Sequence, residues 1–131
     1  MLIAISGWAK SSHGDHTPKH GGQFFMAPDG VHHLEGALVN GKELRVYFYD
    51  AHTHPVKALP FLKTAKVEAQ RVGPDGRETG KPLSLTVSTG PAHGYLSAIL
   101  PKGFKLPVYF TVWLSFPGRA EADLFNFTFE K

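Results

Sequence analysis

Residues 43–50 alternate between apolar and more polar side chains at every position, and this period of two limits the possible folds more than any other feature. Successive side chains of an extended strand point to opposite faces. One face of this segment holds Leu44, Val46 and Phe48, and the other holds Arg45, Tyr47 and Tyr49. The pattern predicts a half-buried antiparallel strand.

Turn signals separate this strand from other short strands. Asn40-Gly41 lies between two such runs and is a strong signal for a hairpin, and Pro28-Asp29-Gly30 and Gly73-Pro74-Asp75-Gly76 also favour turns. An apolar run at residues 56–62 is broken by Pro60. The other predicted strands cover residues 23–27, 31–39, 63–72, 83–88, 95–100, 108–116 and 125–129.

Seven or eight short strands without a convincing helix indicate an all-β fold. We expect an antiparallel, immunoglobulin-like β-sandwich, with a small closed barrel as the competing architecture. The 131 residues suffice for one domain, which we assign to residues 20–131. Whether the alternating Phe125, Phe127 and Phe129 belong to the core or to a dimer surface stays open at this point.

Residues 1–19 are predicted to form a flexible N-terminal arm. Its apolar start, residues 1–9, is similar to the end of a signal peptide but is short and has no basic residue, so either an export-signal remnant or a strand fits. His13 and His16, together with His20, could weakly capture Cu(II), Ni(II) or Zn(II), although a solvated tail is the favoured interpretation.

Charge and cysteine content exclude several classes of function. The formal net charge is +3, but the 14 Lys and Arg residues are scattered, which argues against a nucleic-acid partner. The chain has no cysteine, so disulfides and thiolate chemistry are excluded. No apolar run approaches the length of an integral membrane segment.

Histidines and a carboxylate gather between residues 20 and 54, where five of the eight histidines lie. His33 and Glu35 are two residues apart on a predicted strand and share one face, and His52 and His54 repeat this spacing. If residues 23–27 pair with residues 31–35, His20 comes close to His33 and Glu35. Imidazoles with a carboxylate suit Zn(II) or Cu(II), so we predict a metal site at these five residues.

A structural role for the same residues is the alternative. Imidazole and carboxylate groups hydrogen-bond well to each other, so His20, His33 and Glu35 could fasten the N-terminal segment to the sandwich. His32 is expected to be a partly buried or edge residue, and His93 is a spare candidate ligand.

The residues offer little support for catalysis. His52-Thr53-His54 is similar to the HxH signature of metal-dependent amidohydrolases, but those enzymes need a (β/α)8 barrel of about 250 residues. A turn capped by Asp50 fits the segment better. No Gly-x-Ser-x-Gly elbow or phosphate-binding glycine loop is present. We therefore expect that the protein is not an enzyme.

The chain resembles small exported bacterial domains that have an HGG…HxE motif followed by an LxVYxxD strand. The matching residues are His20-Gly21-Gly22, His33-x-Glu35 and the strand Leu44–Asp50. Such domains occur alone or beside heavy-metal efflux adaptor subunits. The resemblance covers about residues 18 to 56 and implies an extracytoplasmic β-sandwich with a role in copper or zinc handling. His52 and His54 are not part of that motif.

Two functions are therefore expected. The first is a periplasmic or secreted module without catalytic activity that binds a copper or zinc ion, with a metal-efflux or other envelope protein as a possible partner. The second is an envelope interaction domain in which the histidines are structural.

Overall fold

Residues 17–130 are described by the computed structural model, and residues 1–16 and 131 lie outside the described part. The predicted signal remnant, His13 and His16 belong to the residues outside it.

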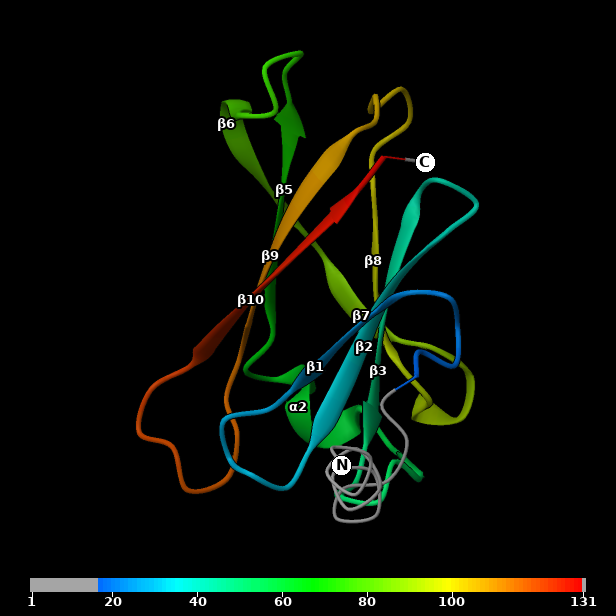
Figure 1. Cartoon of the computed structure of the whole chain (residues 1–131), viewed down its shortest axis with the longest axis vertical. Coiled ribbons are helices and arrows are strands. Elements are labelled where there is room, and N and C mark those ends of the chain that lie inside the picture. Colours follow the sequence, from blue (N-terminus) through cyan, green and yellow to red (C-terminus); the bar gives the residue numbers. More distant parts are fainter. Residues whose placement is uncertain (1–16, 131) are drawn as a thin grey trace, which may run out of the picture.

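Two antiparallel sheets form the two layers of the molecule (Figure 1). The larger sheet has the order β1-β2-β3-β8-β7, with β4 paired to β3, and the smaller sheet has the order β10-β9-β5-β6. The larger sheet comprises β1 (Gln23–Met26), β2 (His33–Val39), β3 (Glu43–Tyr49), β4 (Pro55–Val56), β7 (Val87–Thr89) and β8 (Leu96–Ile99). The smaller sheet comprises β5 (Lys66–Val72), β6 (Glu78–Leu85), β9 (Val108–Leu114) and β10 (Asp123–Phe129).

The predicted all-β antiparallel sandwich is confirmed, with ten strands within residues 17–130. The sequence predicted seven or eight strands, and part of this difference arises at residues 83–88, where a single strand was expected. The chain there passes from one sheet to the other, because β6 ends at Leu85 in the smaller sheet and β7 begins at Val87 in the larger one. Residues 78–82 extend β6 without an apolar pattern, because they lie on an exposed edge strand.

Two short helices lie within residues 17–130, and the sequence had predicted neither of them. Helix α2 (Leu59–Leu62) has a proline in its first turn, where a missing N–H is tolerated, so Pro60 starts a helical turn rather than breaking a strand. The 3₁₀-helix η1 (Pro91–His93) lies in the loop before β8. Neither helix of the described residues has the length or apolar character needed to cross a membrane.

The core lies between the sheets and follows the predicted alternation. The inward residues of β3 are about 1% exposed, and the four inward residues of β9 are fully buried. Phe125 and Phe127 are also buried, so this face of β10 belongs to the core rather than to a dimer surface. The buried inward side chains on these three strands are Leu44, Val46, Phe48, Val108, Phe110, Val112, Leu114, Phe125 and Phe127.

A second buried layer covers the outer face of the larger sheet. Tyr49 was expected on the exposed face of its strand but is only 1% exposed. The ring of Phe24 lies 5.6 Å from the Tyr49 ring, and the ring of His20 stacks on Tyr47 at 3.6 Å between centroids. The N-terminal segment therefore shields the part of the sheet that carries Glu35.

Candidate functional site

The carboxylate of Glu35 is the centre of this outer layer and is completely buried. Its Oε2 accepts hydrogen bonds from the backbone N–H groups of His20 and Gly22 at 2.8 and 2.9 Å. Its Oε1 accepts from the Lys19 N–H at 3.1 Å, from the Tyr49 hydroxyl at 3.0 Å and from His20 Nδ1 at 3.1 Å. A carboxylate offers about four lone-pair sites, so these donors occupy its acceptor capacity.

Two glycines allow the N-terminal segment to approach the sheet so closely. Gly21 has a φ of +71°, in the left-handed region that most side chains disfavour. A Cβ on Gly22 would collide with the backbone carbonyl oxygen of Gly36, on the neighbouring strand β2. The predicted sharp turn and close approach are both present, and they bring the N–H groups of residues 19, 20 and 22 to the carboxylate.

The donors around Glu35 determine its charge. Burial raises the pKa of Glu35, but the hydrogen bonds from Gly22, His20 and Tyr49 outweigh it, so the pKa lies below the ordinary glutamate value. Burial and the neighbouring carboxylate together raise the pKa of the Tyr49 hydroxyl. Glu35 is therefore ionised at neutral pH, and Tyr49 remains a neutral donor.

We expect the stability of the protein to fall in acid because of Glu35. A carboxyl whose pKa is lowered on folding stabilises the fold above its unfolded-state pKa, and that contribution is lost as the pH falls through the lowered value. The free energy of unfolding should therefore decline below about pH 4.5, the ordinary glutamate pKa, with at most about 1.4 kcal/mol per pH unit from this one group. Urea denaturation at several pH values would measure the slope.

The Glu35→Gln variant should show a shallower decline over the same range. The pKa values of Asp29 and Glu43 are lowered too, so part of the slope should remain. An unchanged slope in Glu35→Gln would contradict the assignment to Glu35.

His33 is held by a different partner. It is buried at 2% exposure, and its Nδ1–H donates to the backbone carbonyl oxygen of Asp50 at 3.0 Å. Its ring lies 5.6 Å from the Phe24 ring. The predicted hairpin does form, with Phe24 opposite Glu35 and Met26 opposite His33. The His33 imidazole, however, binds the Asp50 carbonyl and so holds the loop after β3 rather than the N-terminal segment.

His52 and His54 lie in that loop and are exposed. The Asp50 carboxylate accepts the backbone N–H groups of both residues at 2.8 and 2.9 Å, and Thr53 has a φ of +63°. His54 Nδ1 is 3.3 Å from the Asp50 carboxylate. These backbone hydrogen bonds lower the pKa of Asp50. The expected turn capped by Asp50 is therefore present.

The five predicted metal ligands are thus distributed over three hydrogen-bonded settings. His20 contacts Glu35, His33 contacts the Asp50 carbonyl, and the exposed loop carries His52 and His54. Residues 17–130 contain no group of three or more His, Asp or Glu side chains that could hold a metal ion. Copper or zinc binding at these residues stays a prediction, whereas the alternative role of fastening the N-terminal segment agrees with the contacts of His20 and Glu35.

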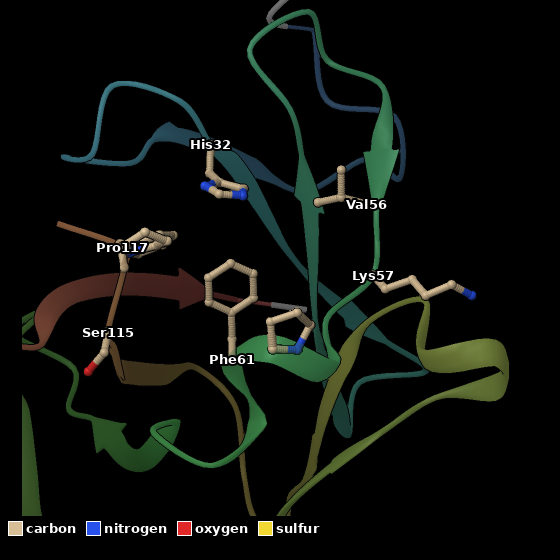
Figure 2. A pocket seen from close by; sticks show the side chains of 8 residues that line it. His32, Val56, Lys57, Phe61, Ser115 and Pro117 are labelled. Carbon is tan, nitrogen blue, oxygen red and sulfur yellow. The ribbon is translucent and has the colours of Figure 1, made fainter. Parts of the chain in front are cut away.

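The sequence interpretation did not single out a second carboxylate–imidazole pair, Asp29 and His32. His32 Nδ1 lies 2.6 Å from Asp29 Oδ2, and the same carboxylate accepts the backbone N–H groups of Val31 and His32. His32 lines a cavity of about 460 Å³ together with Phe61, Phe116 and others (Figure 2). The sequence signal for this pair was the spacing of three residues between Asp29, in the Pro28–Gly30 turn, and His32.

Comparison with known proteins gives a partial similarity to a named enzyme. The chain is 32% identical over 90 residues to the probable L,D-transpeptidase YbiS of Escherichia coli strain K12, and equally to the protein of that name in strain O6:H1 (CFT073). The similarity covers 53% of this chain and 29% of each relative, so the chain spans less than a third of their length. No family model matches the chain, and no solved structure matches it significantly.

This similarity corrects one prediction. The sequence led us to expect that the protein is not an enzyme, because no nucleophile motif was found. The relatives are named as transpeptidases, which are enzymes, and that finding contradicts the prediction. Motif searches within one chain miss such a relationship when the chain spans only part of the related protein.

Proposed function

We propose that this chain is a substrate-recognition module of an L,D-transpeptidase-type enzyme of the cell envelope. The observation that carries the proposal is the similarity to the probable L,D-transpeptidase YbiS over half of this chain. Because the similarity covers only 29% of the relative, the role proposed for this chain is limited to one step, the binding of a peptide that contains an L–D bond.

The sandwich is suited to such a role. A peptide in an extended conformation can add to the edge of a β-sheet through backbone hydrogen bonds. The strand order leaves β1 and β7 at the edges of the larger sheet, and β10 and β6 at the edges of the smaller one. The Glu35 hydrogen bonds tie down the segment that leads into the edge strand β1, and an edge that is already ordered lowers the entropic cost of binding.

Titration with a matched pair of peptides tests the proposal. One short peptide contains an L–D bond, and its diastereomer contains only L residues. We expect saturable binding of the first by calorimetry or NMR, and binding of the second that is at least severalfold weaker. Equal affinities, or no binding of either peptide at millimolar concentration, would overturn substrate recognition.

The envelope location is part of the same proposal, and it is also what the sequence resemblance implied. Expression of the gene at its native locus with a C-terminal epitope, followed by cell fractionation, provides a separate measurement. The protein should appear with periplasmic or envelope markers, and recovery only with cytoplasmic markers would contradict this part of the proposal.

A further inference from the structure

The cavity beside His32 lies where three parts of the fold meet. The loop before β2 contributes His32, the segment around α2 contributes Val56, Pro60 and Phe61, and the chain after β9 contributes Phe116 and Pro117. Its volume of about 460 Å³ falls within the usual range for small-ligand sites. Figure 2 shows the imidazole projecting into the space between Val56, Phe61 and Pro117.

Asp29 fixes both the position and the hydrogen-bonding role of this imidazole. The Asp29 side chain is only 4% exposed. Besides the His32 ring, it binds the backbone N–H groups of Val31 and His32. Burial raises the Asp29 pKa, but the hydrogen bonds outweigh it, so the pKa is lowered and the carboxylate is ionised. An ionised carboxylate only accepts hydrogen bonds, so Nδ1 of His32 carries the proton and donates it. In the neutral ring, Nε2 is then an acceptor.

The remaining walls of the cavity are mostly apolar. The rings of Phe61 and Phe116 lie 5.4 and 5.9 Å from the His32 ring. The Lys57 ammonium donates to the Ala92 carbonyl at 3.2 Å, and Figure 2 shows it directed away from the cavity. The Ser115 hydroxyl is also turned away from His32 in that view. The cavity thus combines one imidazole with aromatic and proline surfaces.

We propose that this cavity binds an aromatic ring that carries a hydrogen-bond donor, such as a phenol or an indole. The ring packs on Phe61 and the two prolines, since aromatic faces and edges favour such contacts, and the O–H or N–H donates to His32 Nε2. The site goes beyond the proposed transpeptidase role and does not depend on it. A bound ring would cover His32 Nε2, so an isosteric ligand without a donor would leave this nitrogen without a hydrogen bond, which predicts selectivity.

Three probes of similar size test the donor at pH 7.5. The folded chain is titrated with p-cresol, 4-methylanisole and 4-methylbenzoate, and binding is followed in ¹H–¹⁵N spectra. We expect p-cresol to saturate with shifts at His32, Phe61 and Phe116, and 4-methylanisole to bind about fivefold more weakly. Equal binding of these two probes, tighter binding of 4-methylbenzoate, or no saturable shifts would overturn the proposal.

A variant pair then assigns the effect to one imidazole. His32→Phe keeps an aromatic ring but removes the acceptor, so p-cresol and 4-methylanisole should bind it equally. His54→Phe changes an exposed histidine elsewhere and should retain the fivefold preference; loss of the preference there would contradict the assignment. If His32→Phe does not fold, the comparison of probes on the unaltered chain still decides.

Titration with N-acetyltyrosinamide distinguishes two sources of the ring, a tyrosine side chain of a peptide and a free phenol. Binding of this compound tighter than p-cresol supports a tyrosine of a peptide partner, and weaker binding supports a free phenol. Either result supports the cavity as a site for a donor-bearing ring.

Discussion

Replacement of Glu35 by alanine is expected to lower the free energy of unfolding by about 3 kcal/mol or more. The substitution leaves three backbone N–H groups and the Tyr49 hydroxyl without their common acceptor. An unsatisfied buried donor costs about 1–3 kcal/mol, although water that enters the space left by the side chain recovers part of this. Domains of this size have total stabilities of about 5–15 kcal/mol, so the loss should be evident in urea denaturation.

Two further variants separate the causes of that loss. Glu35→Gln keeps the size of the side chain and one acceptor oxygen, so it should cost less than Glu35→Ala. Glu68→Ala removes a glutamate whose ion pair with Lys66 lies near the surface, and it should change stability by less than about 1 kcal/mol. If Glu35→Ala lowers the free energy of unfolding no more than Glu68→Ala does, the Glu35 carboxylate does not hold the N-terminal segment on the sheet.

The fold could be predicted where burial is one-sided. In β3 and β9, one face packs on the core and the other is more accessible, so the sequence alternates and the strands can be located from it. The edge strand β6 has exposed side chains along most of its length, so its first residues carry no apolar signal. The crossing between sheets after Leu85 is also invisible, because the alternation continues through it into Val87.

The site could be predicted only in part. Local signals were sufficient for the turn at Gly21, for the hairpin that places His20 near Glu35, and for the Asp50 cap. The partner of His33 could not be predicted, because it is a backbone carbonyl, and any residue supplies one. The burial of Tyr49 depends on His20 and Phe24, which lie more than twenty positions earlier in the chain.

The contact between Gly36 and Phe127 joins the two sheets and explains why a glycine lies in the middle of β2. A Cβ on Gly36 would come within 2.5 Å of the Phe127 ring, which is fully buried. Glycine in a strand is otherwise unfavourable by about 0.5–1 kcal/mol relative to alanine. The absence of a side chain at Gly36 is therefore a packing requirement imposed by one aromatic ring.

A double-mutant cycle at this contact should give a change of sign. Phe127→Ala alone should cost about 3–5 kcal/mol, as expected for an aromatic ring removed from a core. Gly36→Ala alone should cost about 1–3 kcal/mol, because the new methyl group overpacks the core. In the Phe127→Ala background the collision is gone, so Gly36→Ala should instead stabilise the protein by about 0.5 kcal/mol.

Urea denaturation of the four proteins measures this coupling, because residues in contact depart from additivity. Phe116→Ala is the matched control, since Phe116 is also a buried phenylalanine and is not among the atoms nearest to a Cβ at Gly36. Gly36→Ala should cost the same with or without Phe116→Ala. If Gly36→Ala destabilises the Phe127→Ala protein as much as the unaltered one, the ring is not the reason for the glycine, and the two sheets do not meet at this contact as described.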